Sequence, residues 1–410
     1  MPLPPSASGS PRIFPVAAAA FLIVAPFPSS AGWRVFFLLV ALAALAWRSW
    51  RWRVPTGLGQ VPRAFAVTAI AWSLLCVASL LWSVDPGYTL QELRRELLYC
   101  ALAFAVFFAG TRTDAELALW LRLVIAGALV AGACQWLRVI LPNAQWAKSI
   151  SIGPGPFSTH VAMVVPILAI AAWPAPHGLG WRPWASIAAC AALLVMGLAG
   201  ESRILWIALI AAALVAFVLF AASRPKAPRS RAIAARIFVA GVALLVVLMA
   251  LSTEYKLRFY PGAGGSTREM LALDERPIIW KLAFENAAHE PVLGHGYGRD
   301  IAGAEMRQGL QDASATPYNH GHSVLLDTAL QLGLVGTTLF LAMMGCLASA
   351  LLAARRTAAG MPLAIAGLAM MTGYALKNVT DDFYFRPNSL VFWAIAGMLL
   401  GRAARARAER

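Results

Sequence analysis

Two arginines and one histidine could carry chemistry in this chain. Two of them stand where a polar stretch meets a strongly apolar run, and the third begins a predicted amphipathic helix. Arg203 ends the short polar turn 200–203, Arg276 lies within a long polar interval, and His322 closes that interval. Guanidinium groups bind phosphate oxygens through two parallel hydrogen bonds, and an imidazole can take up a proton near neutral pH. These residue types indicate metal-independent transfer from a phosphate-activated donor to a hydroxyl.

Each of the three residues also has an interpretation that involves no chemistry. A lone arginine such as Arg203 often extends its guanidinium to lipid phosphates at a membrane surface. Arg276 could be an ordinary surface arginine on an interfacial helix, and His322 could be a structural histidine. Function is favoured because the three fall in one compartment at one depth, where an ionisable group is costly without a partner or a water-filled cavity. Acidic residues are scarce at this face, and we expect no metal site near His322.

The polar interval from about Ser252 to His322 is the longest in the chain and must position two of these residues. After Arg276, apolar residues recur at helical spacing and predict an amphipathic helix through His289, which would lie on the membrane surface or pack on the bundle. The glycines at 294–298 predict a turn and not a dinucleotide site, because no βαβ unit surrounds them.

The apolar run after the interval predicts how His322 is held. His322, Gly333 and Gly336 share one helical face. Glycines on such a face permit close helix packing. We therefore expect a continuous helix over 323–354 whose packing fixes the imidazole at the outer mouth of the membrane.

Composition places these residues in a membrane protein. Of the 410 residues, 60% are hydrophobic and only 13% are charged, which is more apolar surface than a soluble fold of this length can hide. We expect an all-α polytopic membrane protein with about 12 transmembrane helices and one large periplasmic loop containing short helices. The expected spans lie near 14–29, 33–47, 64–82, 97–110, 117–141, 157–173, 184–200, 203–223, 237–253, 323–354, 362–378 and 389–402.

The positions of the charges that give a net charge of +15 indicate membrane topology and not nucleic-acid binding. Basic clusters near 48–63, 224–236, 355–356 and 402–410 all fall on the cytoplasmic side if both termini are cytoplasmic, which is the positive-inside pattern. The chain then divides into helices 1–9 over 1–253, a periplasmic loop or lid over 254–321, and helices 10–12 with a basic tail over 322–410. The active site would then face the outside of the membrane, which is the periplasm if the cell is a Gram-negative bacterium.

The five cysteines lie inside apolar runs without close pairing, so we interpret them as buried small hydrophobes. We find no phosphate-binding loop and no zinc-protease motif. The sequence therefore indicates no cofactor and no metal.

Several motifs together resemble the O-antigen ligase family, within the superfamily of O-antigen ligases and polymerases. His322-Ser323 followed by Gly333 and Gly336 matches the ligase pattern, and Ser202-Arg203 matches the Ser-Arg turn of the superfamily. The order Arg276, Trp280, Pro291, Gly294 and Gly296 matches a third pattern. The motifs cover mainly residues 200–340, and the first 150 residues agree only in hydropathy.

The resemblance implies a membrane glycosyltransferase that moves O-antigen polysaccharide from undecaprenyl pyrophosphate to a lipid A–core oligosaccharide in lipopolysaccharide biosynthesis. His322 would be the general base for the acceptor hydroxyl. Arg203 and Arg276 would bind the donor pyrophosphate, and inversion of the anomeric centre would follow. His320, His289 and His295 lie close in sequence and stay open as alternative or assisting bases.

Three other functions remain open on the sequence. An O-antigen polymerase commonly has two substantial periplasmic loops, whereas this chain has one. A protein O-oligosaccharyltransferase would use a similar site with a protein acceptor. A transporter or flippase of lipid-linked sugars should place charges near the membrane midplane, and we expect the spans to be nearly free of charge apart from Arg122 and Arg138.

Overall fold

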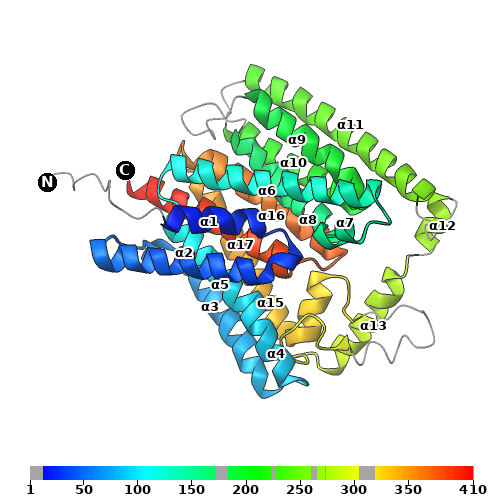
Figure 1. The fold of residues 1–410 in the computed structure, drawn as a ribbon, viewed down its shortest axis with the longest axis horizontal. Coiled ribbons are helices and arrows are strands. Elements are labelled where there is room, and N and C mark those ends of the chain that lie inside the picture. The colour runs from blue at the N-terminus through cyan, green and yellow to red at the C-terminus, as the bar shows by residue number, and fades with distance from the viewer. Residues whose placement is uncertain are drawn as a thin grey trace.

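The computed structural model describes residues 13–171, 183–223, 228–259, 266–272, 274–303 and 319–409. Within these ranges the protein is helical and contains no strand (Figure 1). Each expected apolar run coincides largely with a helix. The helices are α1 Ile13–Val24, α2 Ala31–Trp52, α3 Arg63–Ala78, α4 Pro86–Glu92, α5 Tyr99–Gly110, α6 Asp114–Ile140, α7 Gln145–Ile150, α8 Pro154–Ala171, α9 Pro183–Gly197, α10 Arg203–Ser223, α11 Pro228–Phe259, α12 Thr267–Ala272, α13 Arg276–His289, α15 Val324–Ala354, α16 Gly360–Val379 and α17 Arg386–Ala408. Four short 3₁₀ turns lie at Pro28–Ser30, Leu58–Gln60, Ser79–Leu81 and Leu198–Gly200, and a π-helical segment at Leu93–Leu98.

In the described part of the chain, seven helical segments are long and apolar enough to cross a membrane by length and composition. They are Pro28–Trp52, Arg63–Leu81, Asp114–Ile140, Arg203–Ser223, Pro228–Arg258, Val324–Ala354 and Arg386–Ala408. A polytopic membrane protein is consistent with these segments. The count of twelve spans and the periplasmic side of the loop stay predictions.

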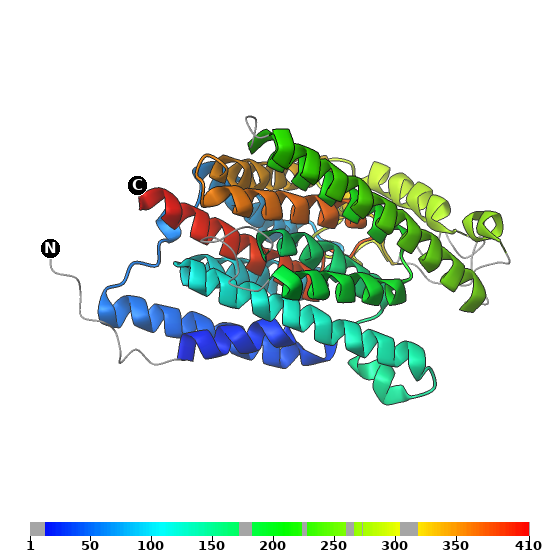
Figure 2. The same cartoon turned by 90° about the horizontal axis from the view of Figure 1, so that it is seen from above.

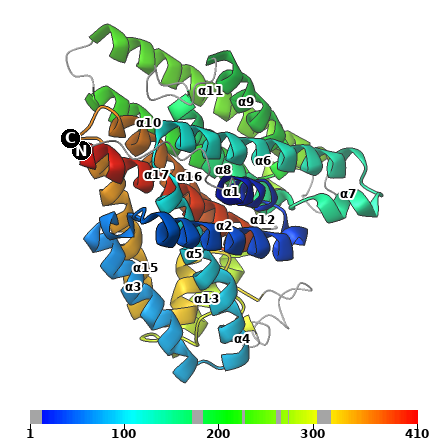
Figure 3. The same cartoon turned by 60° about the vertical axis from the view of Figure 1, so that its left-hand side comes forward.

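Helix α17 lies in the middle of the bundle, with α6 and α16 on one side and α2 and α5 on the other (Figure 3). It is the most buried of the candidate spans. Gly397 and Gly401, one turn apart, meet the α5 backbone at Phe104 and Phe108, and neither site has room for a Cβ. Small residues at this spacing let two membrane helices approach closely.

Helix α15 departs from the expected continuous helix, because it breaks at Gly333, whose φ is 61° and ψ is −160°. The break frees backbone groups that the glycine turn then satisfies. The amides of residues 295–296 donate to the carbonyl oxygens of 330–331 at 3.0 and 2.9 Å. The amides of 334–335 donate to the carbonyl oxygens of 291–292 at 2.8 and 3.3 Å. Gly333 is thus needed for close contact with this turn, not with a neighbouring helix.

The helix predicted after Arg276 exists as α13 and packs on the bundle through its buried face. Ile279 and Ala283 form a small apolar cluster with Ala302 and with Leu330 of α15. Helix α11 continues to Phe259, beyond the expected boundary at 253. Residues 260–265, 273 and 304–318 of the expected loop lie outside the described residues.

The described part of the polar interval gathers at one end of the bundle. Helices α7 and α12 lie at the end opposite the C-terminal end of α17 (Figure 2). The polar interval and the basic C-terminal tail thus lie at opposite ends of the bundle, as they would if they lay on opposite sides of a membrane.

The expectation that the apolar runs carry little charge beyond Arg122 and Arg138 is wrong. Arg34 and Lys377 lie within two of the runs, and their side chains are almost completely buried. Buried ionisable groups at such positions are expensive and mark functional sites. Lys377 belongs to the site described next, and Arg34 lines a separate groove.

Candidate active site

A cavity of about 200 Å³ lies where α8, α10 and α13 begin. Helix N-termini carry unsatisfied amides and partial positive charge, which favour anions. Basic side chains outnumber acidic ones in the lining. The basic residues are Arg203, Lys256, Arg276 and Lys377, and the acidic ones are Glu201 and Asp381. The cavity is therefore suited to a phosphate-bearing ligand.

The predicted turn at 200–203 places Arg203 in the lining of this cavity. Glu201 adopts the left-handed conformation with φ of 50°, which reverses the chain directly before α10. Gly200 lies so close to Ser158 of α8 that a side chain would collide with it. The turn is thus held against α8, and Arg203 enters the cavity as the first residue of α10.

Asp381, in the connector between α16 and α17, contacts three side chains that can carry positive charge. Its carboxylate lies 3.4 Å from Arg276 Nη2, 3.5 Å from Lys377 Nζ and 3.3 Å from His322 Nδ1. Burial alone would raise its pKa, but the hydrogen bond from His322 and the charges of Lys377 and Arg276 outweigh burial and lower the pKa of Asp381 to about 2. Asp381 is therefore a fixed negative charge between the cavity and the imidazole.

The contact with Asp381 also sets the tautomer of His322. A carboxylate can only accept a hydrogen bond, so Nδ1 carries the proton and Nε2 is the basic nitrogen. His322 has a φ of 49°, a left-handed conformation that costs a non-glycine residue free energy. Gly321 N–H, just before it, donates to the buried carboxylate of Asp327 at 2.5 Å. The surrounding contacts hold this strained backbone in place.

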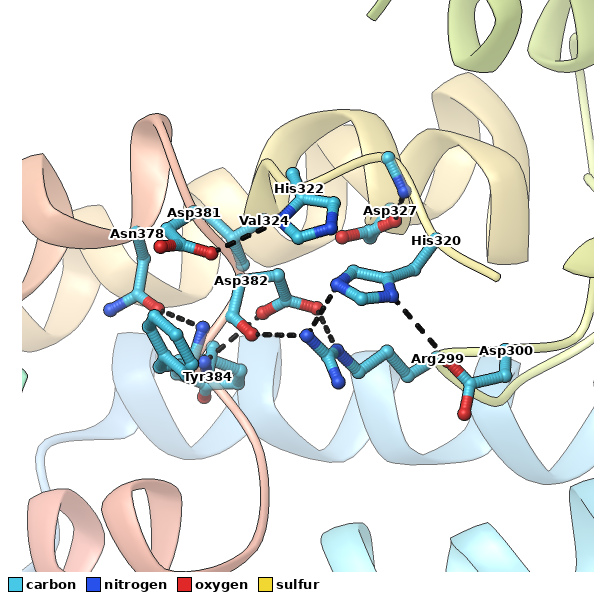
Figure 4. A network of polar contacts seen from close by, with 12 residues as sticks. Arg299, Asp300, His320, His322, Val324, Asp327, Asn378, Asp381, Asp382 and Tyr384 are labelled. Carbon is cyan, nitrogen blue, oxygen red and sulfur yellow. Dashed lines mark hydrogen bonds and ion pairs between the residues drawn. The ribbon is translucent and has the colours of Figure 1, made fainter. Parts of the chain in front are cut away.

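His320 stacks on His322 with ring centroids 4.2 Å apart (Figure 4). Arg299 Nη2 lies 2.6 Å from His320 Nε2, and Arg299 Nε donates to Asp382 at 3.1 Å. Because a guanidinium only donates, His320 Nε2 is the acceptor in this contact. Burial, followed by the charge of Arg299, lowers the pKa of His320 to about 2. His320 is thus a neutral ring that supports His322 and is poorly suited to act as the base.

The other two alternative bases lie in different surroundings. His295 is buried in the glycine turn with Nδ1 3.0 Å from the carbonyl oxygen of Leu330. His289 is exposed at the end of α13. Neither lines the cavity or contacts Asp381 among the described residues, so the geometry favours His322.

Arg203 and Arg276 line one cavity, and His322 reaches it through Asp381. Sequence reasoning missed Lys377, Asp381 and Arg299, and its expectation of few acidic residues at this face overlooked Asp381-Asp382. A signal was present, because a lysine inside an apolar run with an aspartate four residues later predicts an ion pair near a helix end.

Comparison with known families agrees with these motifs. Residues 187–341 match the model of the family described as O-antigen ligase. The similarity to this family covers less than half of the chain. The matched segment contains Arg203, Arg276 and His322, whereas Lys377 and Asp381 follow it. No curated protein matches the chain significantly.

Members of the O-antigen ligase family are membrane glycosyltransferase-like enzymes that use, in general, lipid-linked glycans and lipid acceptors. The cavity lined by Arg203 and Arg276 is compatible with that chemistry, because its basic residues suit a phosphate group.

Replacing Asp381 by asparagine should lower the rate of transfer about 10- to 100-fold. The variant keeps the side-chain size but removes the charge that orients His322 and balances Arg276. Steady-state kinetics on the purified variant would measure this. We expect a lower kcat and a higher donor KM. Asp85→Asn is the matched control, because Asp85 caps α4 from an exposed position and asparagine caps equally well. Unchanged kinetics in Asp381→Asn would rule out this role.

The neutral His320 should make the protein less stable as pH falls. An unfolded histidine binds a proton below its ordinary pKa of 6.5, whereas the folded ring resists protonation down to about 2. Stability is therefore complete above pH 6.5 and decreases below it by about 1.4 kcal/mol per pH unit. Thermal unfolding in detergent from pH 7.5 to 5 should show a shallower decline for His320→Gln, while His289→Gln keeps the original slope. Equal slopes in all three proteins would contradict the assignment.

Proposed function

We propose that the protein is an O-antigen ligase that transfers O-antigen polysaccharide from undecaprenyl pyrophosphate to a sugar hydroxyl of lipid A–core in lipopolysaccharide biosynthesis. One observation carries the proposal. Arg203 and Arg276 line a cavity beside Asp381, and Asp381 contacts His322. The enzyme would lie in a bacterial inner membrane with this cavity facing the periplasm and both termini in the cytoplasm, as the basic clusters favour.

In the proposed reaction, His322 Nε2 accepts the proton of the acceptor hydroxyl as its oxygen attacks the anomeric carbon of the donor. The bond between that carbon and the pyrophosphate oxygen breaks, and its electron pair leaves with undecaprenyl pyrophosphate. Attack from the face opposite the leaving group inverts the anomeric centre. The Asp381 carboxylate accepts a hydrogen bond from His322 Nδ1–H and stabilises the imidazolium that forms.

Fixed positive charge accounts for departure of the pyrophosphate. Arg203 and Arg276 bind it, and Lys256 and Lys377 add charge to the same cavity. These groups are held in place before the reaction, so they stabilise the charge that grows on the leaving oxygen without reorganisation. The proposal requires no metal, because the basic side chains supply this stabilisation.

An in vitro transfer assay tests the proposal. Purified protein is mixed with undecaprenyl-pyrophosphate-linked glycan and lipid A–core, and the product is a glycan of donor length attached to the acceptor. Elongation of the donor glycan without lipid A–core would overturn the ligase assignment in favour of a polymerase. Transfer to a protein acceptor would favour an oligosaccharyltransferase, and movement of the donor between leaflets without bond cleavage would favour a flippase.

A further inference from the structure

A second basic groove lies beside the start of α17, between α2 and the α4–α5 junction. Its volume is about 250 Å³. Three arginines from distant parts of the chain line it, namely Arg34, Arg95 and Arg386. The rest of its wall is largely apolar and includes Phe21, Leu38 and Leu390. The cavity of the proposed active site shares none of these residues.

Arg34 lacks the partners that a buried cation needs. Only 6% of the residue is exposed. In the described part of the chain its Nε has no hydrogen-bond partner, and its Nη1 makes only a 3.5 Å contact with the carbonyl oxygen of Ala25. No described carboxylate lies within ion-pair distance of it. A guanidinium in apolar surroundings costs several kcal/mol unless it is compensated. An anion in the groove would compensate it.

The other two arginines are tethered at the rim and keep part of their surface exposed. Arg386 lies 3.3 Å from Glu92 and 3.5 Å from Glu96, and Arg95 lies 3.4 Å from Glu92. Burial raises the pKa of Glu96 to about 7, so this carboxyl is partly neutral near pH 7. Two carboxyl groups, one of them partly neutral, therefore face three guanidinium groups. The groove keeps a positive charge.

Neighbouring aromatic side chains indicate that this end of α2 lies at a membrane surface. Trp33 and Phe36 flank Arg34 in sequence, and 62% and 53% of their areas are exposed. Phe37 packs against both rings. Exposed tryptophan and phenylalanine beside a cation are typical of the boundary between lipid chains and headgroups. A ligand with both a phosphate and a hydrocarbon chain fits this position.

We propose that this groove binds an anionic phospholipid, whose phosphate lies among Arg34, Arg95 and Arg386 and whose acyl chain lies along the apolar wall. An anionic headgroup is favoured over a zwitterionic one because an ammonium group would face three guanidinium groups. The ring of Phe385 lies 6.0 Å from the Arg386 guanidinium and 4.0 Å from that of Arg299. Arg386 thus lies directly after the connector that carries Asp381. The inference rests on residues outside the cavity and stands apart from the proposed function.

Native mass spectrometry of the purified, delipidated full-length protein tests this inference. Phosphatidylglycerol should bind at least about tenfold more tightly than diacylglycerol with the same chains, as loss of charge-assisted hydrogen bonds implies. Arg34→Gln and Arg95→Gln should each remove most of this preference. Arg258→Gln is the control, because Arg258 is an exposed arginine on α11 paired with Glu254 at 2.7 Å. Arg95 is partly exposed, so its variant remains informative if Arg34→Gln does not fold.

Three results would overturn the inference. One is phosphatidylglycerol binding that neither variant weakens. Another is equal binding of glycerol phosphate, which has the headgroup without the chains. The last is displacement of phosphatidylglycerol by an equimolar phosphorylated glycolipid acceptor, which would assign the groove to that acceptor.

Discussion

Replacing His322 by alanine should reduce glycan transfer by about 10²–10⁴-fold, the usual contribution of a general base. The imidazole contacts Asp381 and can take the proton of a hydroxyl near neutral pH. Transfer to lipid A–core by equal amounts of purified protein measures the effect. Donor binding should change little, because Arg203 and Arg276 remain in the cavity.

A second variant separates chemistry from folding at this strained position. Asparagine tolerates the left-handed conformation of residue 322 and can hydrogen-bond Asp381, but it cannot take up a proton. His322→Asn should therefore unfold like the original protein and still lose transfer. His289→Ala, at an exposed histidine, should retain full activity. Full surface O-antigen in cells carrying either His322 variant would show that the base lies elsewhere.

Arg203→Gln and Arg276→Gln should each lower transfer by about 10²–10³-fold, the cost of removing one preorganised group that stabilises a leaving oxyanion. Both arginines line the cavity, but only Arg276 also contacts Asp381. Arg276→Gln combined with Asp381→Asn should therefore lose less than the product of the two single effects, whereas Arg203→Gln with Asp381→Asn should be closer to multiplicative.

Lysine variants test whether geometry or charge matters at these positions. Arg203→Lys keeps the charge but loses the two parallel hydrogen bonds of a guanidinium, so it should recover only part of the activity. Arg258→Gln is the matched control, because Arg258 is exposed and does not line the cavity, and it should behave like the original protein. Normal donor KM and kcat in both glutamine variants would contradict the proposed pyrophosphate site.

The broken helix α15 explains why the His322 motif contains a glycine at 333. The sequence pattern places both residues on one helix, but the glycine is required by the turn at 291–296, which pairs with the freed backbone groups. Periodicity predicts a helix from local composition. It cannot predict a break that is stabilised by hydrogen bonds from a segment elsewhere in the chain.

The sequence alone predicted the helical membrane class and the three candidate residues Arg203, Arg276 and His322. These features are local, because an apolar run fixes a helix by its length and composition. Arg203 and His322 stand at polar-to-apolar boundaries, and Arg276 begins an amphipathic helix. Tertiary structure decided which groups meet them. Asp381 contacts His322 across 59 residues and Arg276 across 105, because the α16–α17 connector folds back over the starts of α13 and α15. Contacts at such separation leave no periodic trace in sequence, and the lone charge of Lys377 in an apolar run was their single local sign.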